Sequence, residues 1–435
     1  MIFSNNFLEI FELNHLIRKS SLTLDIVNLP VYVASIFIPN WTLILLGFLM
    51  AFGITWVTIP SVVNISRLKD LCSKPNGRTS HTNYIPSLGG IAVFIGLVLS
   101  TVIFAGIYFK FELKYIFAGL LIVFFVGIKD DIMIIDPVKK LAGQIFAIVL
   151  IAVFAGIRIT NLYGLFHIGQ LPYLVSILLT VFVFIVIING FNLIDGIDGL
   201  ASGIGILTST VFGIWFWMTG NIGYAIFSFS FVGTLAAFFR FNVFSKTNKI
   251  FLGDTGSLLT GFVVGVLACR FLQLELVAQG TTFIISAPTV VCGILIVPLF
   301  DSLRVFILRI KQGKSPFKAD RQHIHHRLLQ LGCSHLQATL ILISVNLFFI
   351  VLSYLLRGIG IIWLMCVILG LASLMSQILF IYAKERSKKE IDSVLSLYFA
   401  VKIHQYRNRK IGIAEKRPIM IPVYNSQEKV HAVMN

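Results

Sequence analysis

Two amides and two carboxylates interrupt an otherwise apolar part of the chain, in the stretch NGFNLIDGIDGL at residues 189–200. Asp195 and Asp198 are three residues apart, as are Asn192 and Asp195, so in a helix they would lie on neighbouring faces of one turn. A helix N-cap explains one aspartate, but it does not explain two acids, two amides and three glycines together. Oxygen ligands of this kind suit a hard cation such as Mg²⁺.

A second acidic pair, Asp130-Asp131, lies in the stretch GIKDDIMIIDPVKKLAGQ at residues 127–144. Adjacent carboxylates repel each other, and they cost free energy at a membrane boundary unless a cation or a proton-transfer task requires them. We therefore predict a functional role for this pair. Lys139 and Lys140, which follow, are interpreted as charges that orient the chain in a membrane.

A shorter motif, Gly-Asp-Thr-Gly-Ser at residues 253–257, leads into another apolar segment. Small residues and exposed amides at a helix start make an anion site, and Asp254 would add a metal ligand beside it. The same five residues also fit an ordinary turn with an N-cap, so the motif alone is a weak signal.

Basic residues mark the stretch KPNGRTSHTNYIPSLGG at residues 74–90, which contains Lys74, Arg78 and His81. A positively charged flank followed by a Pro/Gly helix entry would explain this composition. Arg and Lys are also the side chains that bind phosphate oxygens, and glycine lets a backbone approach a ligand closely. The stretch is therefore a candidate for phosphate binding.

Three histidines, His323, His325 and His326, lie in a loop at residues 304–332 that also holds seven Lys and Arg, Arg321 among them. A lone histidine is usually structural, but histidines among so many cations favour an anionic ligand or acid-base work. Zinc is the alternative for this cluster, although no cysteine lies within it and the acids are in distant loops.

The elements that must position these residues are membrane-spanning helices. Of the 435 residues, 57% are hydrophobic and only 12% charged, and the mean hydropathy is +0.91. About 20 mostly apolar residues span a bilayer as a helix, and backbone groups in lipid must be satisfied within the segment. We predict an all-α, polytopic helical bundle with about eleven transmembrane helices. They lie near residues 42–64, 88–109, 114–128, 141–157, 172–189, 199–218, 222–239, 256–272, 283–303, 336–356 and 359–382.

The loops divide into two sides by their basic residues. Loops after odd-numbered spans, with the C-terminal tail, hold 28 of the 35 Lys and Arg. Because positive residues stay in the cytoplasm, this side is predicted to be cytoplasmic and the N-terminus to lie outside. The N-terminal sequence lacks the features of a removable signal peptide. The basic tail is interpreted as an orientation signal and a contact for anionic lipid headgroups, and no nucleic-acid reader is visible.

All five clusters fall on the predicted cytoplasmic side, so they can meet at one face. Acids and amides for Mg²⁺, together with Arg, Lys and His for phosphates, are what phosphoryl transfer requires. A secondary transporter is the rival from another class, because it also has many spans and ionisable residues. Transporters place such residues near the membrane midplane and often contain two repeated halves, whereas these acids lie at predicted span ends and no repeated half is found.

The residues also resemble a known family, the polyprenyl-phosphate N-acetylhexosamine-1-phosphate transferases. The resemblance covers residues 42–385, with an extracytoplasmic arm at 1–41 and a basic cytoplasmic tail at 386–435 outside it. Its motifs, in the family's order, are RTSHTNYIPSLGG (78–90), GIKDDIMIIDPVKKLAGQ (127–144), NGFNLIDGIDGLA (189–201), FNVFSKTNKIFLGDTGS (241–257) and SPFKADRQHIHHRLLQLG (315–332).

The resemblance implies a reaction at the bacterial plasma membrane. The His-Ile-His-His form is similar to the branch that uses UDP-N-acetylglucosamine or a related UDP-N-acetylhexosamine, and less similar to the branch that transfers phospho-N-acetylmuramoyl-pentapeptide. That branch joins the sugar-1-phosphate to undecaprenyl phosphate and releases UMP, with Mg²⁺ required and Mn²⁺ as the alternative ion. The partners implied are these two substrates and the lipid bilayer, with no nucleic acid. The sequence does not fix the oligomeric state, and a homodimer stays open.

Residue roles follow from the same resemblance. Asp254 and Asn192 would be Mg²⁺ ligands, and Asp130 and Asp131 would lie beside the lipid phosphate. One of the pair would assist deprotonation, although a phosphate monoester with a second pKa of about 6 is already largely dianionic. Asp195 and Asp198 would contact the nucleotide or order the metal site, and His323, His325 and His326 would bind diphosphate or sugar. The substrate-binding candidates are Lys74, Arg78, His81, Asn189 and Arg321.

Overall fold

The computed structural model describes eight stretches of the chain, with side chains up to residue 386. They are residues 39–73, 85–109, 111–276, 284, 286–313, 323–410, 421–425 and 428–432. Within them the chain is almost entirely helical, as predicted. The strands form two short antiparallel pairs, which are β1 (Cys72–Ser73) with β2 (Ile85–Pro86) and β3 (Ile421–Asn425) with β4 (Glu428–Ala432).

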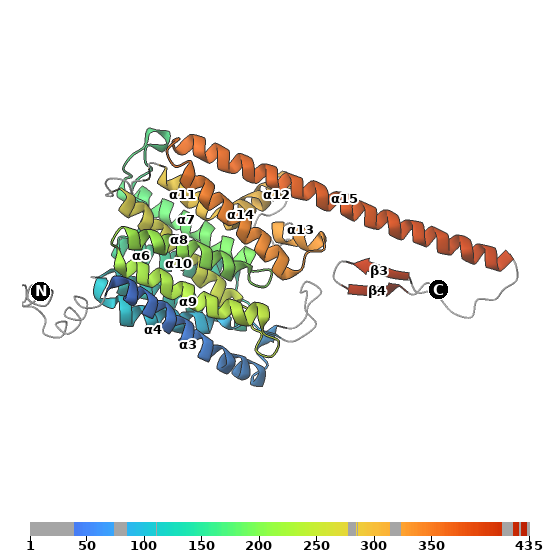
Figure 1. The fold of residues 1–435 in the computed structure, drawn as a ribbon, viewed down its shortest axis with the longest axis horizontal. Helices are drawn as coiled ribbons and strands as arrows, with labels where there is room; N and C mark the ends of the chain where they lie inside the picture. The colour runs from blue at the N-terminus through green and yellow to red at the C-terminus, as the bar shows by residue number, and fades with distance from the viewer. Residues whose placement is uncertain are drawn as a thin grey trace, which may run out of the picture.

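The helices lie side by side in a bundle (Figure 1). They are α3 (Asn40–Leu68), α4 (Gly89–Ala105), η2 (Gly106–Tyr108), α5 (Glu112–Ile132), α6 (Pro137–Phe154), η3 (Leu165–His167), α7 (Tyr173–Ile194), α8 (Leu200–Met218), α9 (Ile222–Phe244), α10 (Gly253–Glu275), α11 (Ala287–Ile294), α12 (Ile296–Lys311), α13 (Ile324–Gln330), α14 (His335–Leu355) and α15 (Ile361–Lys410).

The helices agree with the predicted polytopic architecture. Nine helices in the described residues are long and apolar enough to cross a membrane, and the bent pair α11 and α12 would make a tenth. Helix α5 has 21 residues and carries charges at both ends, with an uncharged stretch at 115–128 between them. Adding α5 gives the expected count of about eleven. The orientation of the termini stays a prediction.

The predicted span at residues 283–303 is broken. It is formed by α11 and α12, which meet at an angle of 83°. In a continuous helix the ring of Pro298 would clash with the carbonyl of Ile294. Asn346 of α14 satisfies the backbone at this break, because its amide donates to that carbonyl (3.0 Å) and accepts from the N–H of Val297 (3.3 Å).

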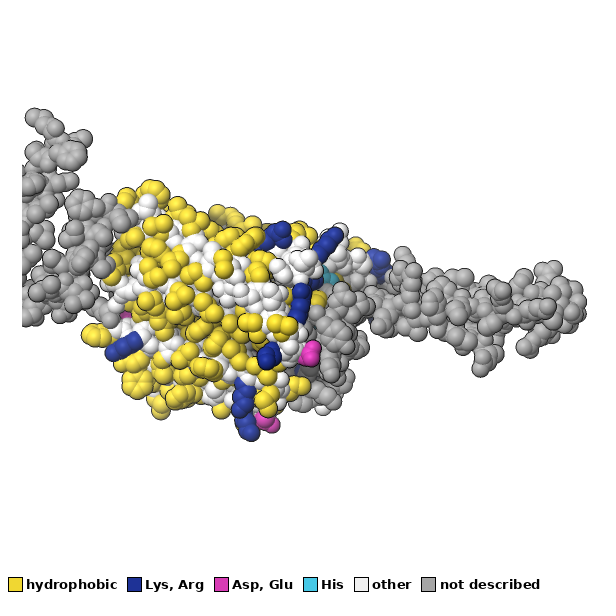
Figure 2. All heavy atoms as spheres, turned by 90° about the horizontal axis from the view of Figure 1, so that it is seen from below, with side chains coloured by type: hydrophobic (Ala, Val, Ile, Leu, Met, Phe, Trp, Pro, Cys, Tyr) yellow, Lys and Arg dark blue, Asp and Glu magenta, His cyan; other side chains and the backbone are white. Residues whose placement is uncertain are grey.

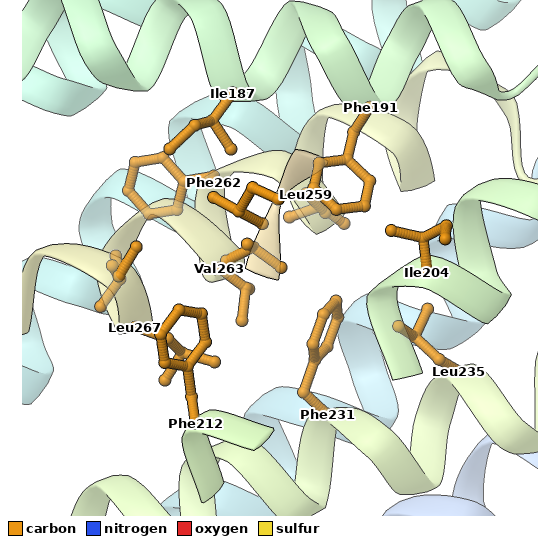
Figure 3. Packing of buried hydrophobic residues seen from close by; sticks show 14 of the residues in the cluster. Ile187, Phe191, Ile204, Phe212, Phe231, Leu235, Leu259, Phe262, Val263 and Leu267 are labelled. Atoms are coloured by element: carbon orange, nitrogen blue, oxygen red, sulfur yellow. The ribbon is translucent and has the colours of Figure 1, made fainter. Parts of the chain in front are cut away.

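Helix α10 lies at the centre of the packing. It contacts α4, α5, α7 and α8, and 83% of its membrane-spanning window is buried. Glycines allow this close approach, because a Cβ on Gly261 would lie 2.4 Å from the Cα of Ile188. Apolar side chains of α10 interlock with those of α7, α8 and α9 (Figure 3). They are Ile187 and Phe191 of α7, Ile204 and Phe212 of α8, Phe231 and Leu235 of α9, and Leu259, Phe262, Val263 and Leu267 of α10.

The outer surface of the bundle is apolar. Figure 2 shows hydrophobic side chains over the flank, with most of the visible Lys and Arg toward the end from which α15 extends. Only 22% of the membrane-spanning window of α15 is buried, and the helix continues past the other helices (Figure 1). This distribution is that of a protein whose flank faces lipid.

Candidate functional site

Polar side chains gather where α5 and α7 end and where α6 and α10 begin. We call this group the carboxylate cluster, which consists of Asp130, Asp131, Lys140, Asn192, Asp195 and Asp254. Helix ends bring these residues together because neighbouring antiparallel helices place the end of one beside the start of the next. The predicted meeting of the second, third and fourth motifs is therefore observed.

Lys140 lies between two acids of the cluster. Its ammonium group is 2.8 Å from Asp130 Oδ2 and 3.1 Å from Asp254 Oδ1. Asp130 also accepts a hydrogen bond from the backbone N–H of Ile135 (2.9 Å). The interpretation of Lys140 as an orientation charge is therefore incomplete, because its charge balances two carboxylates that would otherwise repel each other.

Asp131 caps helix α10. Its carboxylate accepts hydrogen bonds from the backbone N–H groups of Asp254 (2.7 Å) and Thr255 (3.0 Å), and from the Thr255 hydroxyl (2.6 Å). Gly253, with φ +71°, makes the turn that allows this contact. The anion site expected at the start of α10 is thus occupied by a carboxylate of the protein itself, which satisfies two amides of the first turn.

The amide of Asn192 contacts the first turn of α10. It donates to Asp254 Oδ1 and to Ser257 Oγ (2.9 Å). Asn192 and Asp254, which were expected to share a cation, are therefore direct neighbours in space, although 62 positions separate them in the sequence. Asn189 lies one turn earlier and donates instead to Gln144 of α6 (3.1 Å). That contact joins α6 to α7.

Asp195 and Asp198 lie in the turn between α7 and α8. Their three-residue spacing predicts neighbouring faces of one turn if a helix forms here, but α7 ends at Ile194 and α8 starts at Leu200. Within the described residues, Asp195 makes no hydrogen bond. Burial raises the pKa of its carboxyl well above the usual range, and the charges of Asp254 and Asp131 raise it further.

Asp198 has basic partners on two other elements. Lys249 Nζ lies 2.7 Å from Asp198 Oδ2, and His335 Nδ1 lies 3.4 Å from the same oxygen. Burial opposes ionisation, but the hydrogen bonds from His335 and Lys249 outweigh it, so the pKa of Asp198 is lowered. The turn is also fixed by Asn242, whose Oδ1 accepts from the N–H of Gly199 (2.7 Å). Asp198 is therefore an ion-paired residue that orders the turn.

The histidine segment, residues 323–326, lies against this turn. His325 is 1% exposed, and a Cβ on Gly196 would be 2.6 Å from its Nε2. Neither ring nitrogen of His325 has a hydrogen-bond partner among the described residues. Burial, with a smaller contribution from the nearby charge of His326, lowers the pKa of His325 to about 3. His323 Nδ1 lies 3.0 Å from Oδ2 of the buried Asp301 on α12.

The carboxylate cluster fits a hard cation such as Mg²⁺ by its chemistry. Asp195 has a carboxylate without a donor in the described residues, and the side chains of Asn192 and Asp254 are in direct contact. Within the same residues no three His, Cys, Asp or Glu side chains converge tightly enough to hold a metal ion by themselves. Mg²⁺ is commonly held by one or two carboxylates, with waters and substrate phosphates completing its shell.

Four predicted site residues lie outside the described residues, and four observed partners were not predicted. Lys74, Arg78, His81 and Arg321 lie in stretches that the structure does not describe. Four partners were not predicted as site residues, and they are Lys140, Lys249, Asp301 and His335. Lys140 and Lys249 lie within the motifs at 127–144 and 241–257, but no spacing there indicates which acid each one contacts, and Asp301 and His335 lie in no motif. Of these four, only Asp301 has a signal in the sequence, because it is an acid within an otherwise apolar predicted span.

Known proteins similar to this chain agree with the motifs. The sequence model of glycosyl transferase family 4 matches residues 113–272, from α5 to α10. The undecaprenyl-phosphate alpha-N-acetylglucosaminyl 1-phosphate transferase of Escherichia coli K12 is 31% identical over 279 residues, 63% of this chain and 73% of that relative. The Yersinia pestis protein of the same name is 33% identical over 277 residues, which cover 62% of this chain and 72% of that relative. The probable undecaprenyl-phosphate N-acetylglucosaminyl 1-phosphate transferase of Bacillus subtilis 168 is 30% identical over 342 residues, which cover 77% of this chain and 91% of that relative.

The fold and the site define a polytopic membrane protein in which acids and histidines lie together at one end of a helical bundle. The names of its relatives identify the class of protein as a transferase. The chain belongs to glycosyl transferase family 4, in the branch of the undecaprenyl-phosphate N-acetylglucosaminyl 1-phosphate transferases. This membership favours an enzyme over the secondary transporter.

Proposed function

We propose that this enzyme transfers N-acetylglucosamine 1-phosphate from UDP-N-acetylglucosamine to undecaprenyl phosphate in the presence of Mg²⁺. An oxygen of the lipid phosphate attacks the β-phosphorus of the sugar nucleotide. The bond from that phosphorus to the bridging oxygen breaks, and UMP leaves with that oxygen. The products are undecaprenyl-diphospho-N-acetylglucosamine and UMP. The proposal rests on the meeting of the carboxylate cluster with the histidine segment, in a chain whose relatives bear this name.

Asp254 and Asn192 would hold Mg²⁺, with Asp195 close by. When bound there, the ion would neutralise phosphate oxygens during transfer. Asp131 is engaged by three donors of the first turn of α10, so its part is to fix Asp254. Asp130 is engaged by Lys140 and by the Ile135 amide. Both acids of the pair therefore already accept hydrogen bonds from the protein, and a lipid phosphate that is largely dianionic does not require a base.

The histidine segment would bind the diphosphate or the sugar of the donor. A pKa of about 3 keeps the His325 ring neutral at physiological pH, so it can donate one hydrogen bond and accept another. A buried ring without a partner carries a free-energy penalty until it is hydrogen-bonded. A substrate oxygen that reaches His325 would remove that penalty. The glycine at position 196 provides the space for the ring beside the acidic turn.

The position of the site suggests its place in the cell. The basic loops favour a cytoplasmic site at the bacterial plasma membrane, where soluble sugar nucleotides meet a membrane-embedded lipid. A transfer of this kind forms the first lipid-linked sugar of a cell-envelope polysaccharide. UDP-N-acetylglucosamine is the donor we propose, with other UDP-N-acetylhexosamines as the alternatives that an assay must separate.

The assay measures UMP released by the purified protein from UDP-N-acetylglucosamine, undecaprenyl phosphate and Mg²⁺. Asp254→Asn should lower the rate by at least about 100-fold, since it removes one charged ligand. The matched control is Asp136→Asn. Asp136 is an exposed aspartate that caps α6 through the Val138 N–H (2.8 Å), and an asparagine keeps that cap.

Activity of the control and loss in Asp254→Asn would support the assignment. Release of UMP only from another UDP-N-acetylhexosamine would correct the sugar. If the intact wild-type protein released no UMP from any of these donors, the proposed reaction would be overturned.

A further inference from the structure

The C-terminal helix α15 packs against α13, the helix that carries His325 and His326, and an aromatic ring makes one of these contacts. Phe380 of α15 is half-buried, and two guanidinium groups lie over its ring. The Cζ atom of Arg304 on α12 is 4.5 Å from the ring centroid, and that of Arg327 on α13 is 4.9 Å away. Guanidinium groups are attracted to aromatic faces at such distances. Through this ring α15 contacts both α12 and α13. Among the described residues no other aromatic contact joins α15 to either helix.

Arg304 continues this contact toward the site. Its Nη2 donates to Oδ1 of Asp301 (2.9 Å), one turn earlier on α12. The same oxygen accepts from the backbone N–H of Ile324 (3.1 Å), and Oδ2 lies 3.0 Å from His323 Nδ1. Asp301 is only 2% exposed. A buried carboxylate with three donors holds each of them in a narrow geometry.

The contact with Asp301 fixes one end of the histidine segment. Because a carboxylate can only accept, His323 Nδ1 must carry the proton, which leaves Nε2 as the nitrogen available for other contacts. Ile324, the first residue of α13, is held by the same carboxylate. At the other end of α13, Arg386 of α15 donates to the carbonyl of Leu331. Both ends of α13 thus depend on α15, directly or through Arg304.

We propose that Phe380 is a positioning residue for transfer, which sets His323 and the histidine segment through Arg304 and Asp301. This inference rests on the proposed function. It gives the last membrane helix a part in the site although none of the predicted site residues lies on it. Loss of the ring would remove one contact from each guanidinium group, loosen Asp301, and let α13 shift against the acidic turn.

The first test compares purified variants in the UMP-release assay. Phe380→Leu keeps an apolar side chain but removes the ring face, whereas Phe380→Trp keeps an aromatic face. Tyr382→Leu is the matched control, because Tyr382 is a 63% exposed ring on the same helix. We expect Phe380→Leu to lower kcat about tenfold, with KM for the sugar nucleotide changed less than about threefold. Phe380→Trp should recover most of the rate, and the control should match the wild type.

A double substitution tests whether the ring acts through Arg304. Arg304→Lys keeps the charge but loses the planar group that stacks on the ring. If the two residues act as one unit, the double variant should be no slower than about the slower single variant. Multiplied losses would show that Phe380 and Arg304 act independently, and this would overturn the relay.

The second test does not depend on activity. Hydrogen exchange in detergent would be followed in peptides covering residues 323–331. Phe380→Leu should speed exchange there about tenfold, while Tyr382→Leu and Phe380→Trp should leave it unchanged. Unchanged exchange in Phe380→Leu would overturn the inference whatever the rate. Faster exchange in a protein whose wild type releases no UMP would instead support the positioning contact and overturn the proposed function.

Discussion

The carboxylate cluster and the histidine segment are held in different ways. The cluster lies at the ends of central helices, and α10, which carries Asp254, is 83% buried over its membrane-spanning window. Backbone amides and a neighbouring lysine fix its acids. The histidine segment depends on Asp301 and on contacts from α15, whose window is 22% buried. A site can thus combine a rigid acidic half with a half whose position is set by a few side chains at the periphery.

The largest effect is expected from Lys140 in the rigid half. Lys140→Met removes the cation between Asp130 and Asp254, so their repulsion is no longer balanced. We predict a loss of at least about 100-fold in UMP release. Lys139→Met is the matched control, since Lys139 is exposed and adjacent in sequence. A twofold change or less in both variants would show that Lys140 only orients the chain.

A smaller effect is expected where the two halves meet. Gly196→Ala places a Cβ 2.6 Å from His325 Nε2, and the ring must move away from the acidic turn. We expect UMP release to fall by about tenfold to 100-fold, with the melting temperature in detergent little changed. Gly169→Ala is the control, because a Cβ there meets nothing within 4 Å. Equal rates in the two variants would argue against a substrate contact at His325.

The cap of α10 should show in stability. Asp131→Ala leaves the N–H groups of Asp254 and Thr255 without their acceptor. The free energy of unfolding should fall by about 1–3 kcal/mol, as expected for a lost cap or a buried unsatisfied donor. Thermal unfolding in detergent would measure this, and Asp131→Asn should recover part of it. An unchanged melting temperature in the alanine variant would mean that water replaces the cap.

The smallest effect concerns pH. The pKa of Asp198 is lowered in the folded protein by its partners His335 and Lys249. Its ion pair therefore stabilises the fold above the unfolded-state pKa of about 3.9, and this stability is lost as pH falls through the lower folded-state value. Lys249→Met should weaken that acid dependence, by no more than about 1 kcal/mol for a partly exposed pair. The expectation would be contradicted if the free energy of unfolding changed equally with pH in the wild type and in Lys249→Met between pH 3 and 5.

The sequence predicted most of the fold because each span is a long apolar run with polar ends. It also predicted that the motifs meet, since charge placed their loops on one side. It could not predict the break at Leu295, because Pro298 alone does not say whether a helix bends or ends, and Asn346 completes the break from a distant helix. Contacts such as Lys140 with Asp254 were missed for the same reason. They depend on which helix ends are neighbours, and no local pattern records that.

The order of the helices along the chain has a consequence for how the enzyme is made. Helices enter the membrane as the ribosome delivers them, and the carboxylate cluster is complete in sequence once α10 has been synthesised. The histidine segment follows, but Phe380 and Arg386 arrive last. A nascent chain that stops before α15 has every acid of the carboxylate cluster and every histidine of the histidine segment, but none of the contacts that α15 makes with α13. If Phe380 positions the histidine segment as proposed, synthesis of α15 is the step that completes the site.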